Sequence, residues 1–261
     1  MPAHEEAAVP AVDARGIVKR YGGVVALGGV DLSIDAGEVF GIIGPNGAGK
    51  STLFDVLCGI TRPTAGEVRL FGRPIGALAA HEVARLGVAR SFQRTAVFGE
   101  ASVIENLRYG HHASSTHTVV GRMLRSPAWR RDVDAIEAAA RQVLELTGLA
   151  DDRDRPANVL AYGVQRRLAV GIALMAEPRL LFLDEPAAGM NDRESADFVE
   201  LVRRIRANRT IVIVEHDMTV ITALCQRALA MVDGKPVVAG PADQVLRHPE
   251  VVEAYLGAED A

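Results

Sequence analysis

Cysteine is scarce in this chain of 261 residues, and aromatic residues make up only 5% of it. Its two cysteines, Cys58 and Cys225, are far apart and lack the close spacing of metal ligands. They therefore predict two reduced, packed thiols, and exclude a disulfide framework or a zinc cluster. The formal net charge of −4 excludes a strongly basic surface, so we expect no nucleic-acid partner.

Long hydrophobic runs are also missing. The longest, Leu168–Ala176, has nine residues, whereas about 20 are needed to span a bilayer as a helix. The first ten residues are rich in Ala, Glu and Pro and contain no apolar core of a signal peptide. We expect a flexible tail over residues 1–12 and a soluble chain that reaches a membrane only through a partner.

Residues 44–52 form a glycine-rich pattern, G-x-x-x-x-G-K-[ST], between an apolar, strand-like run at Val39–Ile43 and a helical pattern. Its glycines let the backbone turn tightly and point successive N–H groups at an anion. The lysine is placed to reach the β- and γ-phosphates of a nucleotide, and the serine hydroxyl to bind Mg²⁺. The pattern predicts a nucleoside triphosphate site made by Gly44, Pro45, Asn46, Gly47, Ala48, Gly49, Lys50, Ser51 and Thr52.

Two carboxylates, Asp184 and Glu185, end a second apolar run that begins at Leu180. Beside a phosphate-binding loop, the acid at the end of a buried strand is positioned to hold Mg²⁺, which makes Asp184 the predicted metal residue. Glu185 is placed to accept a proton from a water molecule that attacks the γ-phosphate. Together the two patterns predict nucleotide hydrolysis with Mg²⁺ as a cofactor.

Strand and helix patterns alternate through the second half of the chain, which predicts a buried parallel sheet and an α/β fold. Strand patterns on both sides of residues 44–52 predict an antiparallel β-subdomain, and helical periodicity from Val103 to Leu149 predicts an inserted α-helical subdomain. We expect one nucleotide-binding domain. Its parts are a catalytic core with the β-subdomain (about 13–95 and 166–240), the helical subdomain (about 96–165) and a C-terminal helix (241–261).

The segment Leu160–Arg167, with the sequence LAYGVQRR, resembles the signature of the ATP-binding cassette (ABC) ATPases. Three further motifs of that family occur in order and at similar spacing: Gln93 resembles its Q-loop, Ala188–Asn191 its D-loop and His216 its switch histidine. Tyr21 stands where the family places an aromatic ring against adenine. The resemblance covers about residues 14–240 and implies a P-loop NTPase (RecA-like) core with a mixed sheet.

The resemblance implies a role for each matching residue. Those expected to act in ATP hydrolysis are Glu185, His216, Gln93 and Lys50. Gln93 is also expected near Mg²⁺, together with Ser51 and Asp184. Tyr21 would stack on the base, worth about 1–3 kcal/mol by analogy with other base–aromatic pairs. The remaining nucleotide contacts are assigned to Ala161, Tyr162, Gly163 and Asn191.

The signature departs from the usual family form, Leu-Ser-Gly-Gly-Gln. Ala161 removes a hydroxyl, Tyr162 replaces the first glycine and Val164 replaces the glutamine. The forms LAYG, DEPAAG, EHDM and AYLG, found here at residues 160–163, 184–189, 215–218 and 254–257, are similar to those of the importer ATPases for branched-chain amino acids and related polar solutes. Val164 departs from that subgroup as well.

This resemblance implies an ATP-hydrolysing subunit that powers uptake of branched-chain amino acids, or a related small polar solute, through a separate membrane permease. The implied partners are permease subunits, a second ABC ATPase chain (related or identical) and, indirectly, a solute-binding protein. The implied location is the cytoplasmic face of the cell membrane. Three alternatives stay open: a soluble ABC ATPase not linked to transport, an importer ATPase for another solute such as urea, and a regulatory module without turnover.

Two surfaces invite specific hypotheses. Val97 and Phe98 follow Gln93 and have no evident core partner, so they predict part of a groove for a short permease helix; burial of Phe98 in the core is the alternative. Gly163 begins a helix, and we expect its positive end to find no anion within its own chain. A nucleotide held by a second ATPase subunit would then bind there.

Overall fold

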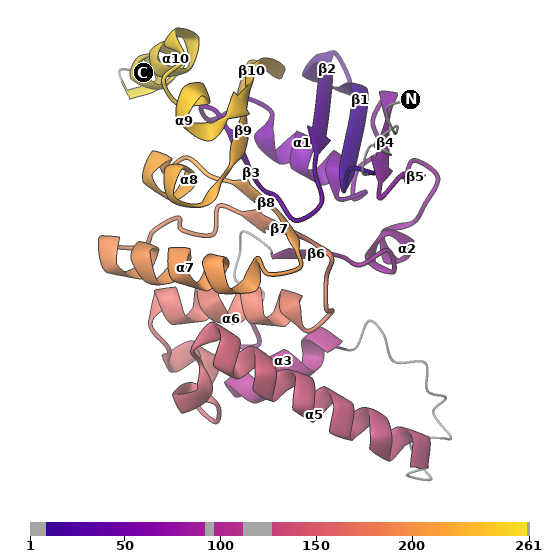
Figure 1. Ribbon diagram of the computed structural model, residues 1–261, viewed down its shortest axis with the longest axis vertical. Coiled ribbons are helices and arrows are strands. Elements are labelled where there is room, and N and C mark those ends of the chain that lie inside the picture. Colours follow the sequence, from indigo (N-terminus) through magenta and orange to yellow (C-terminus); the bar gives the residue numbers. More distant parts are fainter. Residues whose placement is uncertain (1–8, 92–96, 112–126, 260–261) are drawn as a thin grey trace, which may run out of the picture.

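The computed structural model describes residues 9–91, 97–111 and 127–259. Gln93, residues 94–96 and residues 1–8 of the expected tail lie outside the described residues. The tail was expected to extend to residue 12, but Ala11 and Val12 are fully buried and Val12 begins the first strand. Within the described ranges the strands form two sheets, one of four strands and one of six. Figure 1 shows the two sheets side by side in the upper half of the molecule, above a group of helices.

The four-stranded sheet is antiparallel and lies beside the phosphate-binding loop. Its strand order is β2 (Val24–Ile34), β1 (Val12–Tyr21), β4 (Ala65–Leu70) and β5 (Arg73–Pro74). Gly22, at φ 58°, begins the tight turn between β1 and β2. Buried residues recur at every second or third position of β1 and β2, whose pairing shifts register in places, as expected for an irregular sheet that covers a core with one face. The expected β-subdomain is confirmed.

The six-stranded sheet is parallel except at one edge, where β9 and β10 are antiparallel. In β3, β7 and β8 every residue is buried, because helices or the other sheet cover both faces. The strand order is β10 (Lys235–Pro241), β9 (Arg227–Val232), β3 (Val39–Ile43), β8 (Thr210–Val214), β7 (Leu180–Asp184) and β6 (Val88–Ser91).

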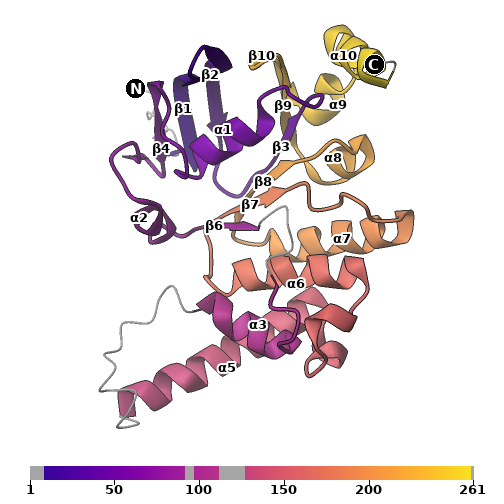
Figure 2. The same cartoon turned by 180° about the vertical axis from the view of Figure 1, so that it is seen from behind.

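The helices divide between the two halves of the molecule (Figures 1 and 2). Those of the upper half are α1 (Lys50–Leu57), α2 (Ala80–Ala84), α8 (Met218–Leu224), α9 (Ala242–Val245) and α10 (Pro249–Glu259). Those of the lower half are α3 (Val103–Gly110), α5 (Pro127–Thr147), α6 (Tyr162–Leu174), α7 (Asp192–Ile205) and the short η2 (Ala150–Asp152) and η3 (Ala157–Val159). The boundary expected between residues 165 and 166 falls inside α6. Among the described residues no helix is both long and apolar enough to cross a membrane.

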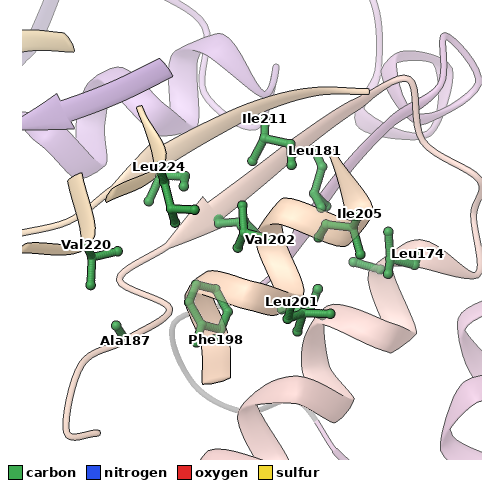
Figure 3. Close-up of a cluster of buried hydrophobic side chains, with 14 of the residues drawn as sticks. Leu174, Leu181, Ala187, Phe198, Leu201, Val202, Ile205, Ile211, Val220 and Leu224 are labelled. Carbon is green, nitrogen blue, oxygen red and sulfur yellow. The ribbon is translucent and has the colours of Figure 1, made fainter. Parts of the chain in front are cut away.

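Two hydrophobic clusters lie on opposite faces of the six-stranded sheet, because successive strand residues point to opposite sides. Phe54 of α1 and Phe182 of β7 pack edge to face in one cluster, with ring centroids 5.1 Å apart. In the other cluster Phe198 and Val202 of α7 lie beneath Leu181 of β7 (Figure 3). The sheet is thus fixed from both sides, and the residues at its strand ends are held in place.

Candidate nucleotide site

The phosphate-binding loop joins β3 to α1 and is packed tightly against neighbouring strands. Gly44 has φ 149°, and a Cβ there would lie 2.2 Å from the carbonyl oxygen of Met231 on β9. Gly49 has φ 89°, and a Cβ there would lie 2.7 Å from the carbonyl oxygen of Ala26 on β2. Only glycine fits either position, so the loop keeps the open backbone cradle that a phosphate chain requires.

Lys50 lies buried at the start of α1, and its ammonium group is folded back across the loop. Its Nζ donates hydrogen bonds to the carbonyl oxygens of Gly44, at 2.6 Å, and Pro45, at 2.9 Å. Burial lowers the pKa of Lys50, and the nearby charges of Glu185 and Asp184 oppose that shift. The arrangement puts a desolvated cation at the loop, where a triphosphate would bring compensating charge.

The loop borders a pocket of about 490 Å³ that also reaches Glu185. Tyr21, which ends β1, is not among the residues that line it; its ring is half exposed, and the Lys19 Nζ lies 4.9 Å from the ring centroid. The lining comes from the start of β2, the phosphate-binding loop with the start of α1, the residue after β7 and the β9–β10 turn. These residues are Val24, Val25, Ala26, Asn46, Gly47, Ala48, Gly49, Lys50, Ser51, Thr52, Glu185, Asp233 and Gly234.

Asp184, the predicted metal residue, is paired with a cation that the sequence analysis did not single out. Its side chain is 3% exposed, and its Oδ2 accepts a hydrogen bond from Nη2 of Arg90, at 2.6 Å. The same guanidinium also pairs with Asp55 on α1 and lies over the ring of Phe54. Burial raises the pKa of Asp184, and Arg90 opposes that shift. The sequence signal that could have indicated this pairing is the charged side chain of Arg90 inside a strand-like run.

Glu185, the predicted proton acceptor, follows β7 in a left-handed backbone conformation, with φ 44°. Its N–H donates to the carbonyl oxygen of Val214 on β8, at 2.9 Å, which holds the turn in place. Such a conformation costs a non-glycine residue about 1–3 kcal/mol and is common at functional sites. It turns the side chain of Glu185 from the sheet into the pocket beside Lys50.

Glu215 connects two segments expected to act on the nucleotide, although it was not among the predicted site residues. It is fully buried at the end of β8, and its carboxylate accepts hydrogen bonds from the N–H groups of Ala187, at 2.7 Å, and His216, at 3.1 Å. Burial raises the pKa of Glu215, against the effect of these hydrogen bonds. The side chain of His216 is 57% exposed, with Nδ1 3.7 Å from Oε2 of Glu215. His216, the residue that resembles the family's switch histidine, therefore faces solvent and lies next to a buried carboxylate.

The signature segment lies at the N-terminus of α6 and contacts the D-loop of its own chain. The Tyr162 hydroxyl donates to the carbonyl oxygen of Ala188, at 3.0 Å, and accepts from Nε of Arg166, at 2.8 Å. Ala161 is the N-cap residue and supplies no side-chain cap. Val164 is half-buried and packs against the core, which explains why an apolar residue is accepted there in place of the family's glutamine.

The expectation that the start of α6 finds no anion in its own chain is wrong. The N–H of Gly163 donates to Oε1 of Glu194 on α7, at 3.3 Å, and a Cβ on Gly163 would lie 2.7 Å from that oxygen. Glu194 is held by a capping box: its Oε2 accepts from the N–H of Asn191, and the Asn191 side chain accepts from the N–H of Glu194. The sequence could not show this contact, because it depends on how α7 packs beside α6.

Most of the predicted residues fall into two groups in space; Tyr21 and His216 belong to neither, and Gln93 lies outside the described residues. Residues 46–52 and Glu185 line the pocket, with Gly44 and Pro45 just before them in the chain and Asp184 next to Glu185. Ala161, Tyr162, Gly163 and Asn191 meet where α6 and α7 begin. Within the part of the chain that the structure describes, no group of three or more His, Cys, Asp or Glu side chains is arranged to hold a metal.

Two family models match the chain. The model of the ABC transporter family covers residues 27–188, and that of the branched-chain amino acid ATP-binding cassette transporter covers residues 238–261. The chain belongs to the ABC transporter family of ATPases, so its nucleotide is ATP, and the resemblance drawn from its motifs is confirmed.

Several similar proteins are named for branched-chain amino acid transport. The chain is 39% identical to the high-affinity branched-chain amino acid transport ATP-binding protein BraF of Pseudomonas aeruginosa and 38% identical to LivG of Escherichia coli, over 95% of this chain and 98% of each relative. Among solved structures it resembles the ADP conformation of MJ1267, an ATP-binding cassette of an ABC transporter, with a TM-score of 0.83 and 30% identity over 95% of this chain and 99% of that one. A nucleotide-free cassette from an ABC transporter gives a TM-score of 0.82 at 29% identity, over 94% and 98% of the two chains. The expected P-loop fold with an antiparallel β-subdomain is confirmed.

Proposed function

We propose that this chain is the ATP-hydrolysing subunit of an importer that takes up branched-chain amino acids through a separate membrane permease. The observation that carries the proposal is the combination of an ABC cassette with the C-terminal segment at residues 238–261. Relatives named for branched-chain amino acid transport match nearly the whole chain, which supports the same assignment. The alternative of another small polar solute such as urea draws no support from these relatives.

Mg²⁺ is the proposed second cofactor, and the residues present fit it. Magnesium is commonly held by one or two carboxylates together with the phosphates of the nucleotide and water. Ser51 is exposed at the pocket, and Asp184 ends the buried strand nearby. Gln93, outside the described residues, is a further proposed ligand. When bound, the ion would neutralise charge on the β- and γ-phosphates.

The proposed roles of the remaining residues follow from their positions. Glu185, held at the pocket, would accept the proton of the attacking water, and Lys50 would donate to a phosphate oxygen while its ammonium stays on the Gly44 carbonyl. His216 has an exposed side chain that is free to turn toward a γ-phosphate. Tyr21 would offer its half-exposed ring to the adenine. These groups position the nucleotide and offset its charge, which is most of what phosphoryl transfer needs.

The proposed contact with the permease is the apolar surface at Phe98. Its side chain is 61% exposed, so the alternative that Phe98 is a core residue is wrong. Its ring packs edge to face on the exposed Tyr109, with centroids 4.9 Å apart. An exposed pair of aromatic rings is suited to receive a short helix of a membrane subunit. This contact would place the chain at the cytoplasmic face of the membrane.

A second ATPase subunit, related or identical, is the other proposed partner. The start of α6 would face the nucleotide held by that subunit, and the N–H of Gly163 would contact it after displacement of the Glu194 carboxylate. Because Ala161 lacks a hydroxyl, this contact would depend on backbone N–H groups. A soluble ABC ATPase unrelated to transport draws no support from the named relatives.

The test of this proposal is uptake. A strain from which the encoding gene is deleted should lose uptake of labelled leucine, isoleucine and valine, and the wild-type chain should restore it, whereas Glu185→Gln should not. The chain should also co-purify with permease subunits from solubilised membranes. Normal branched-chain uptake in the deletion strain, or co-purification with no membrane protein, would refute the proposal.

A further inference from the structure

The last helix of the chain reaches the phosphate-binding loop. The hydroxyl of Tyr255 on α10 accepts a hydrogen bond from the N–H of Gly44, at 2.8 Å, although 211 residues separate the two. Gly44 is the first residue of the loop. The contact therefore joins the segment at residues 238–261, whose family model is separate from that of the cassette, to the nucleotide site.

The C-terminal segment is anchored firmly enough to act as a support. Ala242 and Val245 of α9 are buried, and the N–H of Ala242 donates to the carbonyl oxygen of Gln226 at the start of β9. Val251 of α10 is buried, and the ring of Tyr255 packs partly buried against the same hydrophobic cluster. Figure 1 shows α9 and α10 together at one corner of the molecule, next to β9 and β10. The hydroxyl of Tyr255 is thus presented from a fixed backbone.

Gly44 is the point at which such a support would matter. Its N–H contacts Tyr255, and its carbonyl oxygen accepts the hydrogen bond from the Lys50 ammonium, at 2.6 Å. A glycine has the greatest backbone freedom of any residue, and its φ of 149° is reached with ease only by glycine. One hydrogen bond at its N–H therefore limits how the peptide groups on both sides can rotate.

We propose that Tyr255 is a positioning residue for ATP, whose hydroxyl fixes Gly44 and thereby keeps the Gly44 carbonyl and the Lys50 ammonium in the geometry that receives phosphate. The proposal rests on the ATP-hydrolysing function argued above. It gives the C-terminal segment a part in nucleotide binding, through a contact with the first residue of the phosphate-binding loop.

The test is Tyr255→Phe in the full chain, because the ring and its packing stay and only the hydroxyl is lost. The dissociation constants of Mg-free ATP and of ADP should rise about 3- to 10-fold, as expected for loss of one hydrogen bond that acts on binding. The KM for ATP should rise by the same factor, with kcat changed less than about 2-fold. Burial raises the pKa of Tyr255, so the hydroxyl is protonated at neutral pH and the effect should be equal at pH 6.5 and 8.5.

Two variants on the same helix serve as controls. Glu253→Gln changes an exposed side chain and should match the wild type in melting temperature and affinity. Val251→Ala removes buried packing but keeps the hydroxyl, so it should lower the melting temperature while weakening ATP binding less than Tyr255→Phe does. In spectra of the chain labelled with ¹⁵N-glycine, the Gly44 amide should shift and exchange faster in Tyr255→Phe.

The outcomes distinguish a role of the Tyr255 hydroxyl in positioning Gly44 from a role only in docking α10. If Tyr255→Phe lowers the melting temperature but binds ATP as tightly as the wild type, the hydroxyl serves only to dock α10, and the inference is overturned. An unchanged Gly44 amide in the variant also overturns it. A wild-type chain that bound no ATP would instead refute the proposed function itself.

Discussion

The guanidinium of Arg90 lies 2.6 Å from the carboxylate of Asp184, the acid predicted to hold Mg²⁺, and also pairs with Asp55 on α1. Arg90 thus links the strand that leads toward Gln93 with the first helix after the phosphate-binding loop. Since Asp184 is almost fully buried, its ionised form depends on this neighbour. A bound Mg²⁺ would have to share Asp184 with Arg90.

The first prediction concerns this pair. Arg90→Gln should lower the free energy of unfolding by about 3 kcal/mol, because it leaves the charge of Asp184 buried. Adding Asp184→Asn should recover part of that loss, giving a coupling energy above about 1 kcal/mol in a urea-denaturation double-mutant cycle. Arg203→Gln, which breaks the exposed pair with Glu200, is the control and should cost less than about 1 kcal/mol. Additive effects of Arg90→Gln and Asp184→Asn would contradict the prediction.

The second prediction concerns chemistry at the pocket. Glu185→Gln should keep ATP binding and lower the rate of hydrolysis by about 10²–10⁴-fold, because the side chain that accepts the proton is neutralised. Lys50→Ala should weaken ATP binding itself, since the buried cation at the loop is lost. Equilibrium binding and steady-state phosphate release measure the two effects separately. Wild-type turnover in Glu185→Gln would show that another group accepts the proton.

Residues 44–52 and Asp184–Glu185 could be predicted from the sequence because each pattern is local: a strand, a turn and a helix that follow one another in the chain. The strands of the two sheets could be predicted for the same reason. Arg90, Glu194 and Tyr255 could not be assigned, because each contacts its partner across tens to hundreds of residues. Their positions depend on which strands pair and on how helices pack against the sheet and one another, and no periodicity in the sequence records that arrangement.

The third prediction concerns coupling to the permease. Phe98→Glu should abolish solute uptake, because it places a charge on the proposed permease contact. Basal ATP hydrolysis should change by less than about 2-fold, because the side chain is exposed and not part of the core. Stability should change by no more than about 0.5 kcal/mol. Ile60→Glu, at another exposed apolar side chain, is the matched control and should leave uptake intact. Equal loss of uptake in both variants would mean that the effect is not specific to the Phe98 surface.

The fourth prediction concerns the buried carboxylate of Glu215. Its pKa is raised in the folded chain by burial, so the folded state binds the proton more tightly than the unfolded state does. The contribution of Glu215 to stability is then greatest below the unfolded pKa, about 4.3, and falls as pH rises through the folded value. Glu215→Gln should therefore be least stable relative to the wild type near pH 4, below the unfolded pKa, and should gain on it as the pH rises toward neutrality. A difference in unfolding free energy that stays constant across this range would contradict the prediction.

The last prediction concerns the start of α6, where Glu194 accepts the N–H of Gly163. A γ-phosphate brought by a second subunit would have to displace this carboxylate and would be repelled by its charge. In the Glu185→Gln background, Glu194→Gln should therefore tighten ATP-dependent dimerisation about 2- to 5-fold, since a like charge is removed at a helix N-terminus. Glutamine can still accept from the N–H of Asn191, so the capping box is kept.

Gly163→Asp should have the opposite effect. It adds a carboxylate where a Cβ would already lie 2.7 Å from Glu194, so ATP-dependent dimerisation should be lost while ATP binding by the single chain persists. Light scattering after size exclusion in Mg-free ATP, with the chain alone and mixed with a partner ATPase, measures both variants. Glu200→Gln, on the exposed face of α7, controls for general effects of charge. A phosphate and the Glu194 carboxylate would compete for the same N–H donor. A nucleotide site shared between subunits therefore requires that Glu194→Gln strengthen ATP-dependent dimerisation and Gly163→Asp weaken it. Dimerisation of Gly163→Asp at the level of the Glu185→Gln parent would exclude this surface from the subunit contact.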